Sequence, residues 1–156
     1  MATLTVTLQE SVILNGCDYG SINSASVSSV VNGFKRTDKC LRSIQTSLAA
    51  FASSKETASD LASSGPLLDA EDVAYIRLTN LDSTNTIEIA VIGTTTLYQI
   101  ALAPGHSHIL SDCDDFMLAE EDTSPGFGDG KLDLRAIKAQ PVGSVDIDVE
   151  VFIAIK

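Results

Sequence analysis

The stretch Tyr75-Ile-Arg-Leu-Thr79 opens the part of the sequence that decides the fold. Its apolar side chains alternate with polar ones, which is the two-residue period of a β-strand with one solvent-facing side. Turn-forming residues follow at 80–85, and the same alternation resumes at 87–91 and again at 98–102. The pattern predicts three strands that pair as an antiparallel meander. Pro104-Gly105 then fits the centre of a type II turn, because Pro presets φ and Gly accepts the positive φ that follows.

The last segment, residues 145–156, has the cleanest alternation in the sequence. Charged side chains occupy one face, and six aliphatic side chains occupy the other: Val145, Ile147, Val149, Val151, Ile153 and Ile155. Burial of six such side chains contributes on the order of 10 kcal/mol before the entropy cost of folding is subtracted. This segment is therefore predicted to run through the middle of a sheet.

The pattern of the N-terminal residues predicts short strands and turns. Alternating Thr and aliphatic residues at 3–8 predict a strand with a polar face of β-branched residues. Asn15-Gly16 and Asn32-Gly33 are strong turn pairs, and the Ser-rich residues 17–29 predict a loop or a weak edge strand.

Residues 40–52 fit two structures, because their apolar residues suit both a helical and a strand period; we choose the strand. Residues 55–68 read as a mobile connection and residues 120–130 as an exposed loop. Short strands at intervals of about 8 to 12 residues predict an all-β fold, an antiparallel β-sandwich or jelly-roll-like single domain over residues 1–156. Residues 1–33 are the candidate N-terminal attachment segment.

The length and composition predict a chain that folds without disulfide bonds. At 156 residues it is long enough to bury about two thirds of its unfolded surface. Cys17, Cys40 and Cys113 are far apart and odd in number, so we expect free thiols in a reducing compartment. The first residues lack a basic region and an unbroken apolar stretch, and no apolar run approaches a membrane span. We therefore expect neither a signal peptide nor a membrane partner.

The net charge of −11 is unevenly distributed. Residues 34–55 hold five of the ten bases and one acid, whereas residues 110–130 hold seven acids and no base. Such an acidic chain is not expected to bind nucleic acid, since phosphate contacts require excess positive charge. The candidate partner-binding residues form a basic strip: Lys35, Arg36, Lys39 and Arg42. This strip could steer a charged partner or another copy; two solvated faces are the alternative. If charge plays no part in attachment, we expect the attachment surface to consist of Leu4, Val6 and Leu8 of the N-terminal strand.

Three groups of residues could form a metal site or an active site. His106 and His108 would face the same way on a strand, but no third His completes a metal site, and solvated turn residues are the alternative. The acids of residues 112–129 could supply oxygens for calcium, although their spacing matches no known loop. Nucleophile and phosphate-binding motifs are missing from the sequence. We predict no cofactor, no metal site and no enzymatic activity.

Four segments of the chain carry a resemblance: Ala74-Tyr-Ile-Arg-Leu-Thr-Asn-Leu-Asp82, Thr86-Ile-Glu-Ile-Ala90, Leu102-Ala-Pro-Gly105 and Val145-Asp-Ile-Asp-Val-Glu-Val-Phe-Ile-Ala154. Residues 74–156 resemble small virion proteins of tailed bacteriophages, especially marine and cyanobacterial phages. The resemblance implies a non-enzymatic protein made in the host cytoplasm and placed on the capsid exterior. There it would act as a decoration or cement protein bound to the major capsid protein or another virion protein. Such proteins often form trimers, and the family brings no catalytic residues.

Two alternatives belong to other classes. The second interpretation is a tail- or fibre-associated protein, including a module that binds host glycans. The absence of Trp and an aromatic content of 5% disfavour glycan binding. A hydrolase on a β-sandwich is the third, disfavoured by the missing nucleophile. We also predict a homotrimer, because an exposed sheet edge with complementary basic and acidic strips can close a ring.

Overall fold

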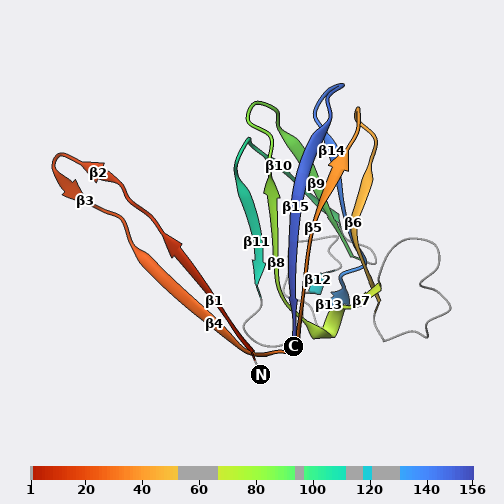
Figure 1. The fold of residues 1–156 in the computed structure, drawn as a ribbon, viewed down its shortest axis with the longest axis horizontal. Helices are drawn as coiled ribbons and strands as arrows, with labels where there is room; N and C mark the ends of the chain where they lie inside the picture. The colour runs from red at the N-terminus through yellow and green to blue at the C-terminus, as the bar shows by residue number, and fades with distance from the viewer. Residues whose placement is uncertain (1, 53–66, 94–96, 112–117, 121–130) are drawn as a thin grey trace.

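The computed structural model describes residues 2–52, 67–93, 97–111, 118–120 and 131–156. Two sheets face each other as a sandwich, and a long N-terminal hairpin projects away from them (Figure 1). The first sheet has the order β11-β8-β15-β5, built from β11 (Ser107–Ser111), β8 (Val73–Asn80), β15 (Ile147–Ile155) and β5 (Asn32–Cys40). All its pairs are antiparallel.

The second sheet has five strands in the order β10-β9-β14-β6-β7. They are β10 (Leu97–Leu102), β9 (Ile87–Ile92), β14 (Ala136–Pro141), β6 (Thr46–Ala52) and β7 (Leu67–Asp69). Its pairs are antiparallel except β6 with β7, which is parallel. A short 3-10 helix, η2 (Ala70–Asp72), leads into β8, and β12 (Leu118–Glu120) pairs with β13 (Lys131–Asp133). The predicted all-β class with antiparallel sheets is confirmed.

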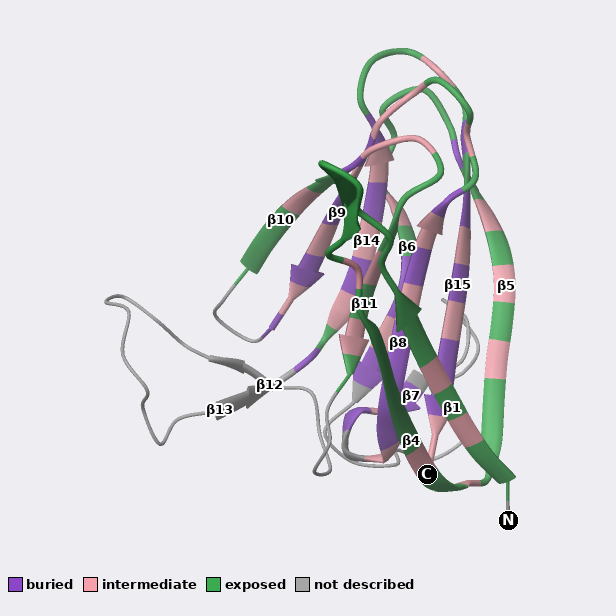
Figure 2. Ribbon diagram, turned by 90° about the vertical axis from the view of Figure 1, so that its left-hand side faces the viewer, coloured by how far each residue is buried: buried purple, intermediate pink, exposed green. Residues whose placement is uncertain are grey.

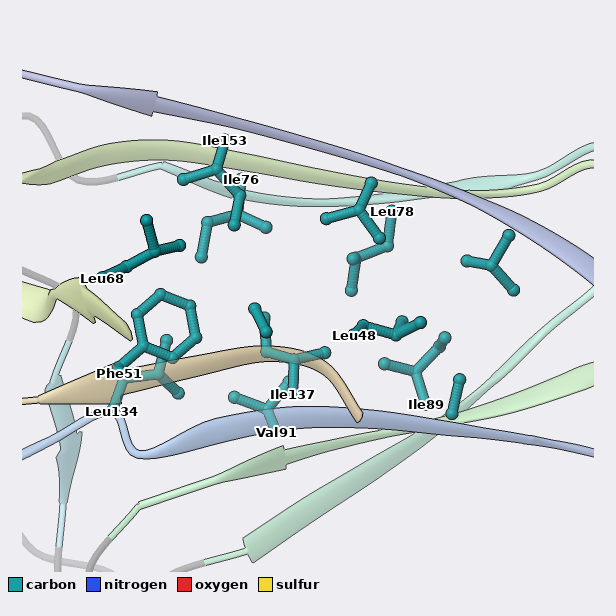
Figure 3. Close-up of a cluster of buried hydrophobic side chains, with 14 of the residues drawn as sticks. Leu48, Phe51, Leu68, Ile76, Leu78, Ile89, Val91, Leu134, Ile137 and Ile153 are labelled. Atoms are coloured by element: carbon teal, nitrogen blue, oxygen red, sulfur yellow. The ribbon is translucent and has the colours of Figure 1, made fainter. Parts of the chain in front are cut away.

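The core lies between the two sheets and is made of aliphatic side chains from alternate positions (Figure 3). Ile76 and Leu78 of β8 project toward Leu48 of β6, Ile89 of β9 and Ile137 of β14, and all five are fully buried. Each strand therefore buries one side-chain face, as its period of two requires. The opposite faces carry most of the polar residues, although Tyr75 and Ala154 are buried there as well.

The predicted position of the last segment is confirmed, because β15 lies between β8 and β5. Four of its six predicted core residues, Ile147, Val149, Val151 and Ile153, are fully buried. Val145 and Ile155 are partly buried and pack at the margin of the core. The strand is one of the two central strands of the four-stranded sheet.

The predicted meander is partly confirmed: all three strands exist and β9 pairs antiparallel with β10, but β8 does not pair with β9. β8 belongs to the four-stranded sheet and β9 to the five-stranded sheet, so the loop between them crosses the sandwich. The fully buried Asn80 shapes this corner: its amide donates to the carbonyls of Asn85 (2.8 Å) and Leu102 (3.0 Å), and its oxygen accepts from the Asp82 amide (3.0 Å). These bonds satisfy backbone groups that the change of sheet would leave unpaired.

The turn at Pro104-Gly105 is confirmed, and it also leads from one sheet to the other. Gly105 has a φ of +70°, and the His106 amide donates to the Ala103 carbonyl at 3.1 Å. The Gly105 amide in turn donates to the carbonyl of Asn80 at 3.1 Å. The two crossing loops are thus bonded to each other.

The N-terminal predictions have mixed outcomes. Asn15-Gly16 is a turn, with φ values of 51° and 79°, between β2 (Ile13–Leu14) and β3 (Cys17–Asp18). Of the loop and the weak edge strand expected at 17–29, the structure shows a strand: most of the stretch forms β4 (Ile22–Val30), which pairs with β1 (Ala2–Gln9). The turn expected at Asn32-Gly33 is wrong: both residues begin β5, and the chain changes direction at Val31, two residues after Ser29 with its φ of 64°.

The ambiguous stretch at 40–52 resolves as a strand for Thr46–Ala52, which confirms the choice of strand over helix. The burial of neighbouring residues agrees with a strand, because Leu48 packs in the core while Ser47 is exposed. Most of the connection predicted at 55–68, and the loop predicted at 120–130 except Glu120, lie outside the described residues.

Candidate interaction surface

The N-terminal arm is the hairpin of residues 2–30, formed by β1 and β4 with β2 and β3 at its end. Leu4 and Val6 lie opposite Val27 and Ala25 in the register and give the arm an apolar face. The other face is a ladder of hydroxyl pairs: Thr5 with Ser26 (3.4 Å) and Thr7 with Ser24 (3.1 Å). The arm is therefore amphipathic, with one face suited to burial.

Among the described residues, no arm residue belongs to the buried core, and the first core residue along the chain is Cys40. The arm is coloured exposed or intermediate along its length (Figure 2). An isolated two-stranded hairpin is marginally stable in water. The two sheets therefore contribute little to the stability of the arm, and a partner surface would stabilise it much more.

Large hydrophobic side chains are concentrated on this arm and at its base. The first 31 residues carry half of the exposed large hydrophobic side chains in the described part of the chain: Leu8, Val12, Ile13, Leu14, Tyr19, Ile22 and Val31. Ile13, near the hairpin turn, is 72% exposed. Apolar exposure concentrated on one element is typical of interaction sites in soluble proteins.

A cleft of about 420 Å³ separates the base of the arm from the outer face of the four-stranded sheet. One wall is β1, and the floor crosses the sheet. The residues that line it are Leu4, Thr5, Val6, Thr7, Lys35, Tyr75, Arg77, Ile109 and Phe152. The floor is ordered by register: Ile109 pairs with Arg77, Arg77 with Phe152, and Phe152 with Lys35.

The floor of the cleft combines aromatic surface with positive charge. The rings of Tyr75 and Phe152 meet edge to face at 5.9 Å. Arg77 donates to one oxygen of Glu150 at 2.6 Å, and Lys35 lies 2.9 Å from the other. The hydrogen bond from Lys35, with the charges of Lys35 and Arg77, lowers the pKa of Glu150. Two cations share one carboxylate, so this part of the floor keeps an excess positive charge.

The structure divides the predicted basic strip between two sides of β5. Lys35 and Lys39 face outward, where Lys35 meets Glu150 and Lys39 lies 3.9 Å from Asp146. Arg36 faces the other sheet: its guanidinium bonds Asp38 at 2.6 Å and the carbonyls of Ser47 and Leu48 on β6. Neighbouring strand residues must point to opposite faces, so the four side chains do not form one surface.

Arg42 lies beyond the end of β5, in the left-handed region with a φ of 45°. Partner binding by Lys35, Arg36, Lys39 and Arg42 stays a prediction, because no partner chain is present. The ion pairs do mean that three of the four cations already have an acidic partner within the chain.

The two histidines make separate contacts. His106 Nδ1 lies 2.8 Å from the Pro104 carbonyl, whereas His108 Nε2 lies 3.3 Å from the Tyr98 hydroxyl. Burial lowers the pKa of His108. In the part of the chain that the structure describes, no three His, Cys, Asp or Glu residues gather as a metal site would require. Nearly all of the acidic stretch at 112–129 lies outside that part.

The cysteines differ in environment. Cys17 is exposed at the end of the arm, and Cys40 is buried, which raises the pKa of its thiol. Cys113 lies outside the described residues.

The chain matches no protein-family model, and no curated protein or solved structure matches it. No helix among the described residues is long and apolar enough to cross a membrane.

Sequence reasoning missed the cleft, because its walls come from residues more than 100 positions apart. It did single out Leu4, Val6 and Leu8, and the structure places all three on the arm, with Leu4 and Val6 at the cleft. No signal in the sequence marks the projection of the arm, because the alternation at 3–8 is that of any strand with one buried face.

Proposed function

We propose that the chain is a non-enzymatic structural protein of a tailed-bacteriophage virion, which binds the outer surface of the capsid as a decoration or cement protein. The observation that supports this role is the N-terminal arm, an amphipathic hairpin outside the core with exposed aliphatic side chains. An element of this kind stabilises an assembly by burying its surface against a neighbouring molecule. The resemblance of residues 74–156 to phage virion proteins supports the virion as that assembly.

The arm can account for attachment better than the basic strip can. Exposed ion pairs are worth about 0 to 1 kcal/mol each, and Lys35, Arg36 and Lys39 already have acidic partners in the chain. A stable interface needs about 800 Å² on each partner, with an apolar centre. The aliphatic side chains of the arm offer such a centre.

Rebinding to particles stripped of this protein tests the proposal. We expect the wild-type chain to rebind and to restore resistance of the particle to heat. The arm variant Ile13→Ser/Leu14→Ser should rebind at least about tenfold more weakly, because it loses two exposed aliphatic anchors. Leu97→Ser, which removes an equally exposed aliphatic side chain from β10, is the matched control and should rebind normally.

Salt and charge reversal test the basic strip in the same assay. Lys39→Glu/Arg42→Glu changes two of its members without touching the cleft or the contacts of Arg36. If these residues guide attachment, rebinding should fall between about 50 and 500 mM salt and fall again in this variant. Rebinding that ignores both changes removes the electrostatic contribution. Wild-type chain that binds only tails, or does not bind particles, contradicts the capsid role.

A further inference from the structure

We propose that the cleft receives the arm tip, residues 10–22, of a second copy of this chain, so that each copy gives one tip and accepts one. The inference rests on the proposed structural role and names the partner of the arm. It would join the copies into a ring before they meet the capsid, so the tip would support attachment by holding the ring together and the rest of each arm would be left for the capsid.

The geometry requires the occupant to come from another molecule. The chain's own arm already forms one wall of the cleft through Leu4, Thr5, Val6 and Thr7 at its base. Its tip lies at the far end of the hairpin, away from the two sheets (Figure 1). Each leg of about 14 residues spans about 45 Å at the rise of a strand, which is long enough to reach a neighbouring copy.

The arm tip and the cleft are chemically complementary. The tip presents apolar side chains together with two acids and no base: Glu10, Val12, Ile13, Leu14, Asp18, Tyr19 and Ile22. The cleft presents Ile109 and Phe152 beside Lys35 and Arg77, which share the single carboxylate of Glu150, and no acid is among its described lining residues. On a chain of net charge −11, an acidic tip is repelled by most of the surface and attracted to this part of it.

The backbone offers a second means of recognition. Within the described residues β1 pairs with β4 alone, and four consecutive β1 residues line the cleft while no β4 residue does. The unpaired edge of β1 therefore faces the cleft. A strand from an incoming tip can add to this edge, and three strands with an apolar face are more stable than two.

The contact is between two different surfaces, so it propagates from copy to copy and ends only when a ring closes. Three copies is the number predicted from the sequence, and we keep it for this ring. Each copy in it would bury one tip and fill one cleft. Attachment to the capsid would then be multivalent, which strengthens weak individual contacts.

The first test is the mass of the full-length chain in solution, measured by light scattering at tens of micromolar. We expect a trimer for the wild type and for Leu97→Ser, and a single chain for Ile13→Ser/Leu14→Ser and for Ile109→Asp. The tip variant keeps an intact cleft and the Ile109→Asp variant keeps an intact tip, so an equal mixture should recover a dimer. A monomeric wild type, or an oligomer that survives Ile109→Asp, overturns the proposal.

The second test uses Cys17, which is exposed within the tip. In a Cys113→Ser background, Ile109→Cys places a thiol in the cleft, and a short dimaleimide should join it to Cys17 of another copy. Leu97→Cys is the control and should give little product. Equal cross-linking of the two variants overturns the proposal. A wild type that is monomeric yet rebinds particles removes this inference alone, whereas a trimer that fails to rebind removes the capsid role alone.

Discussion

Val149→Asp is expected to unfold the protein. Val149 is fully buried in the middle of β15, and its register partner on β5 is Asp38, so the new carboxylate would face another acid. An unpaired charge in such a position costs several kcal/mol, against a total stability of about 5 to 15 kcal/mol for a domain. Circular dichroism with thermal melting should show a lost or strongly lowered transition.

The neighbouring residue supplies the control. Asp148 is exposed on the outer face of the same strand, so Asp148→Ser should change the free energy of unfolding by less than about 0.5 kcal/mol. Equal shifts in melting temperature for the two variants would mean that the facing of β15 is wrong.

Asn80→Ala should destabilise the protein by about 2 to 4 kcal/mol. The substitution leaves the buried Leu102 carbonyl and the partly buried Asn85 carbonyl without their donor, and it removes the acceptor of the Asp82 amide. The corner between the two sheets depends on these three bonds. Urea unfolding measures the effect through the midpoint at an unchanged slope.

Asn85→Ala is the comparison for this corner. The Asn85 side chain bonds Asp82 and Thr84 within the same loop, where solvent can replace it, so its loss should cost less than about 1 kcal/mol. If both variants lose the same small amount, Asn80 does not hold the corner as described.

Alternation predicted the strands well because it reports which face of a strand is buried. It identified β8, β9, β10 and β15 and the central place of β15. It could not identify neighbours, since strands from either sheet of a sandwich show the same period. The meander failed at Asn80 for this reason: an Asn after a strand favours an exposed turn, and only the structure shows it buried between two sheets.

The candidate surface was partly within reach of the sequence. Strand alternation alone implies that Lys35 and Arg36 point to opposite sides of β5, so the division of the basic strip was predictable once that strand was assigned. The projection of the arm was not, because the alternation at 3–8 is indistinguishable from that of a core strand. The cleft brings Ile109 and Phe152 opposite β1, an arrangement that only the tertiary fold determines.

Reconstruction of the virion would locate the chain without assuming how it attaches. We expect density for this fold on the outside of the capsid, as rings in which each arm crosses to a neighbouring copy. Density for the chain confined to the tail, or its absence from the particle, would contradict the account.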